Sequence, residues 1–315
     1  MPARDGNDDP IHLSERIHAV LSAKGPLTGS QLAEALNDTP RIQIWKTCMG
    51  GGQFQTFNCA RYYLRYDITR EDQIRLSPSV LRDFLSFTLV YLPGQRAQAV
   101  EQAAKLANKH RLISLRKLKF ARNTLLALSP DIQKALSDHA CCFIAGDISY
   151  FLAHEEPRVN EQLGVTIKGS DIDIIIVHVN DLTQDIVKEA ERQLLPYKFR
   201  AMKDPNVSQE IDFLFKPVQT MFSQFNYADI HQKIASKILY ESFFLYGRLD
   251  LYENLLTELE FSGTVKRIED DFDKALAGRQ NTIAKILSIE NLDPDDMDPD
   301  VQSLFYFSQE RLEFQ

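Results

Sequence analysis

The sequence has few cysteines, no excess of positive charge and no long apolar run. Only four of the 315 residues are cysteine, and none stands at a metal-ligand spacing (Cys48, Cys59, Cys141 and Cys142). No apolar run reaches the roughly 18 residues that a membrane-spanning helix needs. The first residues, MPARDGNDDP, do not resemble a signal peptide. These absences argue against a zinc-binding, disulfide-rich or membrane protein, and we expect a cytoplasmic one.

The overall balance of charge also excludes a surface that binds nucleic acid by bulk attraction. The formal net charge is −8, with 25% charged residues, which is ordinary for a globular protein. Apolar residues make up 44% of the chain. At this length that content supports two or more domains, each with its own core. No internal repeat is evident.

The amino-terminal segment predicts a winged helix-turn-helix. A first helix is followed by a capping box at Thr28, which opens a second helix. A third helix begins with a Thr-Pro pair at Thr39 and ends at a run of glycines. Two strands, at 53–57 and 61–66, are expected to form the hairpin wing.

A domain of this kind contacts nucleic acid through its third helix and its wing. The candidate contacts are Arg41, Gln43 and Lys46 on the helix, and Arg61 and Arg65 on the wing. Winged helices also serve as protein–protein modules, and the fold alone does not decide between the two.

A basic segment lies in the helices that follow. Between residues 105 and 122 there are seven basic residues and no acid: Lys105, Lys109, Arg111, Arg116, Lys117, Lys119 and Arg122. In a chain of net charge −8 this segregation favours contact with a phosphate backbone. The alternative is a solvated helix face, or pairing with acids elsewhere in the fold.

Two aspartates stand at the start of a strongly apolar strand. Asp171 and Asp173 lead into a run of β-branched residues at 174–177. Side chains two residues apart on a strand share a face, so these carboxylates are roughly 6–7 Å apart along the backbone. Two unpaired acids at this place are costly, and a divalent cation relieves the cost.

A third acid fits the same site. Asp212 is embedded in a second strand-like run, residues 210–215. If that strand pairs beside the first, three carboxylates gather at one place. Two metal ions about 3.5–4 Å apart would then clamp the attacking and leaving oxygens of a phosphoryl transfer. Asp212 is also placed to take the proton of the attacking hydroxyl.

Residues 140–255 resemble the DNA polymerase β-type nucleotidyltransferase superfamily. The resemblance consists of a Gly-Asp turn at Gly146, a helix-like segment at 148–153, the Ser-Asp-Ile-Asp run that ends at Asp173, and the later Asp212. It implies a small mixed-sheet palm that uses Mg²⁺ or Mn²⁺, held by the three aspartates, to transfer a nucleotidyl group from an NTP. The sequence departs from the family pattern at Asp147, where Ser or Gly is usual, and in its longer spacing from turn to strand.

The resemblance also implies which residues meet the nucleotide. They are Gly146, Asp147, Ser149, Ser170, Lys233 and Lys237. A glycine in the turn lets the backbone approach the triphosphate. The two lysines lie one turn apart on a long helix predicted at 226–247, and the alternative is that they are ordinary surface lysines.

The segment 248–255 is loosely similar to a conserved stretch of the abortive-infection (AbiE-type) toxin nucleotidyltransferases of phage defence, from which Leu249 and Glu253 depart. We predict an α+β fold in four consecutive parts: a winged helix-turn-helix at 1–75, a helical connector at 76–139, a nucleotidyltransferase palm at 140–220 and a helical domain at 221–315.

The sequence supports two functions. The first is a metal-dependent nucleotidyltransferase that acts on a hydroxyl of RNA, a nucleotide or a protein. The alternative is a DNA-binding winged-helix regulator, or toxin–antitoxin partner, with a degenerate palm. Asp147 favours the alternative because an acid repels a triphosphate, and the set of three acids favours the enzyme. The acceptor, the NTP and the oligomeric state are not determined by the sequence.

Overall fold

The computed structural model is mixed α+β, as expected. It describes residues 10–66, 74–160, 165–204, 207–289 and 305. The chain divides into two compact units built from non-consecutive stretches. Unit one is Met1–Tyr63, Arg75–Asn108 and Lys274–Gln315, and unit two is Leu64–Ile74 and Lys109–Asp273. This division differs from the four consecutive parts that the sequence suggested.

Unit one opens with helices and short strands in alternation. They are α1 (Pro10–Lys24), β1 (Leu27–Thr28), α2 (Gly29–Ala35), α3 (Arg41–Gly50), β2 (Gln55–Asn58), α4 (Val80–Arg82), the π-helix η1 (Asp83–Phe87), β5 (Thr88–Tyr91) and the short η2 (Pro93–Gln95). The capping box at Thr28 is confirmed. Its hydroxyl accepts from the Gln31 N–H, and the Gln31 side chain accepts from the Thr28 N–H.

The three-stranded sheet of unit one has the order β1-β5-β2. The predicted hairpin between residues 53–57 and 61–66 is therefore wrong, because β2 pairs with β5 and not with the strand that follows it. That next strand, β3 (Tyr63–Tyr66), pairs instead with β4 (Ile74–Ser77). The sequence also predicts a helix that opens at Ser77-Pro78 and runs through roughly Tyr91, but the end of this segment is the strand β5. Its last four residues, Thr88–Tyr91, are fully buried, and a short buried run has no period that separates strand from helix.

An ion pair between Asp83 and Arg279 is buried in unit one. The Asp83 carboxylate accepts hydrogen bonds from Asn58 Nδ2 at 2.6 Å, Tyr62 OH at 2.7 Å and Arg279 Nη2 at 2.7 Å. Arg279 lies on α11 (Thr264–Ser288) and also donates to the Pro78 carbonyl at 2.8 Å. All donors to the carboxylate come from unit one, so residues far apart in the sequence meet around one acid.

Two helices contribute to both units. These are α5 (Arg96–Leu125) and α11. The remaining elements of unit two are α6 (Pro130–His139), β6 (Ala140–Ile144), η3 (Gly146–Ile148), β7 (Pro157–Asn160), β8 (Val165–Lys168), β9 (Ile172–His178), α7 (Gln184–Lys203), β10 (Ile211–Pro217), α8 (Val218–Gln224), α9 (Ile230–Tyr240), β11 (Phe243–Gly247) and α10 (Leu249–Phe261).

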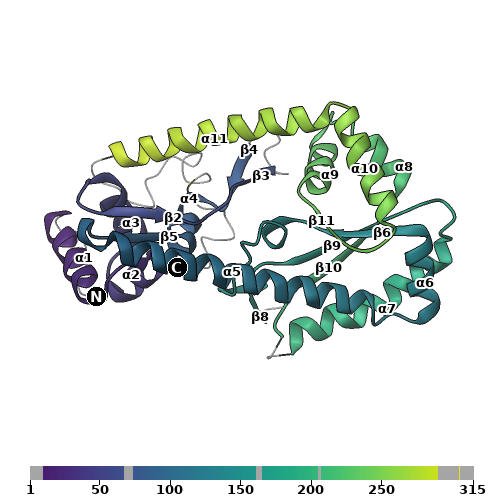
Figure 1. The fold of residues 1–315 in the computed structure, drawn as a ribbon, viewed down its shortest axis with the longest axis horizontal. Helices are drawn as coiled ribbons and strands as arrows, with labels where there is room; N and C mark the ends of the chain where they lie inside the picture. Colours follow the sequence, from purple (N-terminus) through teal and green to yellow (C-terminus); the bar gives the residue numbers. More distant parts are fainter. Residues whose placement is uncertain (1–9, 67–73, 161–164, 205–206, 290–304, 306–315) are drawn as a thin grey trace, which may run out of the picture. The chain divides into compact units, whose positions relative to one another are not determined.

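The sheet of unit two has the order β10-β9-β6-β11 and lies between two layers of helices (Figure 1). β6 runs antiparallel to both β9 and β11, and β10 runs parallel to β9. Alternate residues of β6 point to opposite faces, as a strand requires. Cys142 and Ile144 pack in one core with α6, α7 and the second half of α5. Cys141 and Phe143 pack in the other with α8, α9 and α10.

Three elements of unit two differ from expectation. The sequence predicts an extra strand at 197–202, but this prediction is wrong, because α7 continues through Pro196 and buries Ala201 and Met202. The predicted helix at 226–247 ends at Tyr240, and the chain then forms β11 at the edge of the sheet. The helix expected at 148–153 is only the 3₁₀ turn η3.

A Gly residue fixes the end of β11. Gly247 has φ +92°, and a Cβ there would lie 2.2 Å from the carbonyl oxygen of Ala140. Only glycine permits this approach of β11 to the start of β6. Gly247 therefore lets this segment pair with β6, where the sequence predicted a continued helix.

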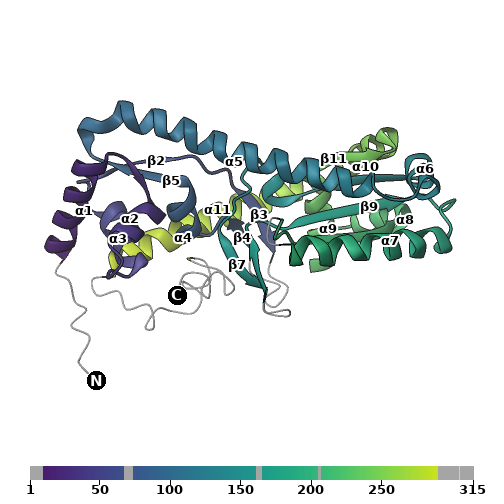
Figure 2. The same ribbon diagram turned by 90° about the horizontal axis from the view of Figure 1, so that it is seen from below.

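The sequence predicts a helical stretch at 95–128 with a break near residues 113–114, but α5 is continuous and is visible as one long helix in Figure 2. The sequence has five aspartates in the eight residues 293–300, which predicts a solvated linker, but this run lies outside the described residues. Across the described part of the chain, no helix combines the length and the apolar character needed to span a membrane.

Candidate functional site

The predicted neighbour of the Asp-Ile-Asp strand is confirmed. β10 pairs with β9 in parallel, and the register places Asp212 directly beside Asp173. Registered residues of neighbouring strands share a face, so the two carboxylates project on the same side of the sheet. Asp171 immediately precedes β9, and both Asp171 and Asp173 are exposed. The strand starts therefore bring the three predicted acids to one end of the sheet.

A lysine that sequence reasoning missed contacts the third acid. Lys198 of α7 donates from Nζ to Asp212 Oδ1, with side-chain exposures of 33% and 45%. A half-exposed pair of this kind contributes little to stability, about 0–1 kcal/mol. Lys198 stood in the segment predicted to be a strand. The helical spacing of apolar residues through Met202 was the signal that would have placed it on α7.

The acids at this sheet end suit a hard cation in their chemistry. Mg²⁺ and Mn²⁺ prefer oxygen ligands such as carboxylates. The side chains of Asp171, Asp173 and Asp212 provide carboxylate oxygens as their only ligand atoms. As placed, the described residues contain no group of three or more His, Cys, Asp or Glu side chains arranged to hold a metal. In the structure the Lys198 ammonium supplies a positive charge beside the Asp212 carboxylate. A metal bound by all three acids would displace that contact.

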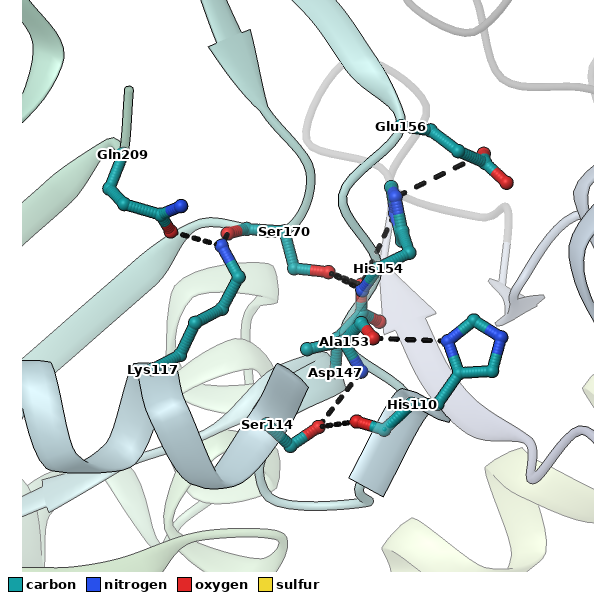
Figure 3. A network of polar contacts seen from close by, with 9 residues as sticks. All are labelled: His110, Ser114, Lys117, Asp147, Ala153, His154, Glu156, Ser170 and Gln209. Atoms are coloured by element: carbon teal, nitrogen blue, oxygen red, sulfur yellow. Dashed lines mark hydrogen bonds and ion pairs between the residues drawn. The ribbon is translucent and has the colours of Figure 1, made fainter. Parts of the chain in front are cut away.

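Asp147 and Ser170 contact each other across the site (Figure 3). The Ser170 hydroxyl donates to Asp147 Oδ2 at 2.6 Å and accepts from the His154 N–H at 3.2 Å. His154 Nε2 is 3.8 Å from the same Asp147 oxygen. Ser170 immediately precedes Asp171, so the turn after β6 is linked directly to the start of the Asp-Ile-Asp strand.

Lys117 is buried, which corrects its place on a solvated basic face. It donates from Nζ to the Ser170 carbonyl at 2.7 Å and to Gln209 Oε1 (Figure 3). Ser170 and Gln209 precede β9 and β10. Lys117 of α5 therefore joins the two segments that lead into the acid-bearing strands.

α5 also holds the loop that carries His154. His110 Nδ1 lies 3.0 Å from the Ala153 carbonyl oxygen, and the Ala153 N–H donates to Ser114 Oγ at 3.1 Å. Figure 3 shows these contacts beside Asp147 and Ser170. The basic helix is thus part of the framework behind the site.

Gly169 allows the closest approach of backbone within this network. It has φ +69°, and a Cβ on it would lie 1.7 Å from the His154 carbonyl oxygen. Its own N–H donates to the Glu156 carbonyl at 2.9 Å. No side chain fits at residue 169 without separating the loop from the strand.

We expect Gly169→Ala to lower the free energy of unfolding by at least about 1–3 kcal/mol, because it combines a positive φ with a backbone clash. The matched control is Gly278→Ala in α11, where a Cβ has no neighbour within 4 Å. That variant should be neutral or more stable by about 0.5–1 kcal/mol. Urea unfolding of both proteins checks the prediction, and equal stability of the two would contradict it.

The Gly146 turn holds an acid that the sequence analysis did not identify. Glu241 immediately follows α9 and lies close enough to Gly146 for the backbone N–H of that residue to affect its pKa. Its Oε1 lies 2.6 Å from Lys237 Nζ, with side-chain exposures of 2% and 11%. Burial raises the pKa of Glu241, whereas Lys237 and the Gly146 N–H act in the opposite direction. Ser149 donates to the Gly146 carbonyl at 2.8 Å.

The two predicted nucleotide lysines have different surroundings. Lys237 is buried against Glu241. Lys233 remains 31% exposed, with Nζ 4.0 Å from Asp271 Oδ2 and 5.5 Å from the centre of the Tyr227 ring. Lys233 is therefore the more accessible of the two.

Comparison with known proteins gives no relative. The chain matches no family model, and neither a curated protein nor a solved structure is significantly similar to it. Any function has to be argued from the geometry of the site.

Proposed function

We propose that this protein is a metal-dependent nucleotidyltransferase of the DNA polymerase β type. The observation that carries the proposal is the register of Asp212 beside Asp173 at the sheet end where β6 leads into the Gly146 turn. The order β6, turn, β9, α7, β10 in unit two also supports a nucleotidyltransferase palm.

In this proposal Asp171, Asp173 and Asp212 hold Mg²⁺ or Mn²⁺. When bound, the metal supplies positive charge that polarises the phosphoryl oxygens of the NTP. Asp212 accepts the proton of the acceptor hydroxyl, which requires that Lys198 leave its carboxylate. Lys233 is accessible enough to meet the triphosphate from α9.

The test is a transfer assay with each labelled NTP and Mg²⁺, using RNA, protein or no acceptor. A labelled product formed by the native chain and not by Asp173→Asn supports the proposal. If no NTP gives a product with any acceptor, the proposal fails.

The topology of unit one supports a winged helix. The order α1-β1-α2-α3-β2 followed by β5, with the sheet order β1-β5-β2, gives β2 and β5 as the strands of the wing. We propose that they take the place of the hairpin first expected at 53–66. Arg41, Gln43 and Lys46 of α3 are all half-buried, and Arg61 is exposed.

The alternative function, a DNA-binding regulator or toxin–antitoxin partner with a degenerate palm, is favoured by the acids at the phosphate turn. Asp147 and Glu241 both place carboxylates next to Gly146. Thermal unfolding with NTP and Mg²⁺ separates the two functions, because the enzyme should be stabilised by these ligands and the regulator with a degenerate palm should not. A ligand at 100 times its dissociation constant stabilises by about 2.7 kcal/mol.

The outer face of α5 supports a nucleic-acid acceptor. The members of the basic segment that are exposed and have no acidic partner among the described residues are Lys109, Arg111, Lys119 and Arg122. Arg116 pairs with Glu155 and Lys105 with Glu101 at the surface, where such pairs are weak. Four unpaired cations on one helix of an acidic chain favour a local anionic partner.

We expect binding of single-stranded nucleic acid to weaken steeply with salt. Reversing Lys119 and Arg122 to Glu should flatten the slope of log K against log salt by roughly 1.4, at 0.7 per lost phosphate contact. The control reverses Lys188 and Lys203, two exposed lysines of α7, with the same change in charge. Fluorescence anisotropy at several salt concentrations gives the slopes. Equal slopes for the two double variants would exclude the α5 face.

A further inference from the structure

β10 is an edge strand of the unit-two sheet. The strand order β10-β9-β6-β11 gives it one partner, β9, and no strand on its other side among the described residues (Figure 1). In the described part of the chain, no turn, loop or cap donates to or accepts from the backbone of residues 211–216. The central residue of β10, Leu214, is 51% exposed. An unpaired edge with an exposed apolar centre is a template on which another strand can pair.

The sequence of β10 is self-complementary about Leu214. Asp212 stands two residues before Leu214 and Lys216 two residues after it, while Phe213 and Phe215 flank it directly. In an antiparallel pairing of two copies centred on Leu214, Asp212 of each copy lies opposite Lys216 of the other. Phe213 of each copy then lies opposite Phe215 of the other. Opposite charges and aromatic pairs that face each other across two strands stabilise the pairing, whereas like charges weaken it.

Lys216 has no acidic partner among the described residues of its own chain. It is half-buried, and its Nζ donates to the neutral side-chain amide oxygen of Gln224 at 2.7 Å. Burial lowers the pKa of Lys216, as expected for a cation without a counterion. Asp212 uses Oδ1 for its contact with Lys198, which leaves Oδ2 for a further donor. A second copy paired through β10 would give Lys216 its counterion.

The helix α7 adds exposed apolar side chains close to this edge. Its Lys198 contacts Asp212 of β10. Leu195 is three residues before Lys198 and four before Phe199, so the three side chains adjoin on the helix surface. The Leu195 and Phe199 side chains are 52% and 43% exposed. A two-fold contact brings the α7 helices of both copies to the same side of the joined sheet, so these side chains can cover one another.

We propose that this chain forms a two-fold homodimer in which β10 pairs antiparallel with β10 of a second copy, centred on Leu214. The two sheets of unit two then become one continuous sheet. Each copy contributes Lys216 beside Asp212 of the other. The dimer itself does not rest on the proposed function. If Asp212 is a metal ligand, as proposed above, the second copy also supplies a positive charge to each metal site.

The test is sedimentation equilibrium of the full chain without NTP or metal, so its outcome is independent of nucleotidyl transfer. The apparent mass of the native chain should rise from that of the monomer toward twice that value as the concentration increases. Leu214→Lys places two like charges at the two-fold axis and should raise the Kd of the dimer about tenfold or more. The matched control is Leu112→Lys on α5, where the leucine is 53% exposed, and it should associate like the native chain. A native chain that is monomeric at every concentration would overturn the proposal, and Lys216 and Pro217 would then serve to keep the edge unpaired.

Charge reversal tests the register of the pairing. Asp212→Lys sets two lysines opposite each other at both ends of the paired strands, and Lys216→Asp sets two aspartates there. Each variant alone should be monomeric at a concentration where the native chain is dimeric. Mixed in equal amounts, the two variants should form a heterodimer, because every cross-strand pair again joins a lysine and an aspartate.

Circular dichroism melting shows whether each variant is folded. If Asp212→Lys does not fold because of repulsion from Lys198, Leu214→Lys still decides whether β10 forms the interface, since it changes an exposed side chain. A mixture of folded variants that stays monomeric, or single variants that dimerise like the native chain, would contradict a pairing centred on Leu214.

Discussion

Asp173→Asn is expected to abolish nucleotidyl transfer while leaving the fold intact. The rate constant should fall by ~10² or more, the scale of a lost acid–base or ligand group at a reacting centre. Asp173 is exposed and lies beside Asp212. Removing one of several clustered negative charges relieves repulsion, so the variant should be as stable as the native chain or slightly more stable without metal. Asp171→Ala should behave in the same way.

Asp212→Asn should distinguish chemistry from binding. As the proton acceptor, Asp212 should affect the rate constant by ~10² or more and NTP affinity much less. The matched control is Asp181→Asn, an exposed acid of unit two away from the strand starts. Single-turnover rates and NTP titrations measure both quantities. Loss of NTP affinity with an unchanged rate constant in Asp212→Asn would refute the role of Asp212 as proton acceptor. For the preceding prediction, full activity of Asp173→Asn at saturating Mg²⁺ would refute the metal site.

Arg279→Met should destabilise unit one by roughly 3–5 kcal/mol, the usual cost of breaking a buried ion pair. The Arg279 and Asp83 side chains are only 8% and 10% exposed, and Arg279 also bonds the Pro78 carbonyl. Asn58 and Tyr62 still donate to Asp83 in the variant, but the carboxylate loses its ion pair with Arg279.

The measurement is urea unfolding followed by the fluorescence of Trp45, the one tryptophan of the chain, which is buried in unit one. The double variant Asp83→Asn, Arg279→Met removes both charges and should recover part of the lost stability. A single variant as stable as the native chain would show that the pair contributes nothing.

Local signals in the sequence predicted local structure well. The capping box at Thr28 and the strand that follows Asp171 depend on neighbouring residues, and both form as expected. The sequence analysis considered a pairing of the two acid-bearing strands, and β10 does pair with β9, each with an aspartate as its second residue.

The sequence failed where distant residues decide. β5 is a strand because it pairs with β1 on one side and β2 on the other, and β11 is a strand because it pairs with β6. Neither has a period that distinguishes it from a buried helix. In the sequence Glu241 is an ordinary acid inside the helix predicted at 226–247, and only the pairing of β11 with β6 brings it beside Gly146. Lys117 belongs to a basic run, and only the tertiary fold buries it against Ser170. Contacts of this kind cannot be predicted from the spacing of residues along the sequence.

The discontinuity of unit one has a consequence for synthesis on the ribosome. Its core includes Ile286 and Phe305 from the far end of the chain, and the Phe305 ring meets Trp45 edge to face at 5.0 Å. The stretches of unit two between residues 64 and 273 leave the ribosome before these partners exist. Since domains fold as units while the chain is made, unit two is free to fold first. Until Ile286 and Phe305 are synthesised, the amino-terminal helices expose an apolar face. Chaperones bind exposed apolar surface of this kind.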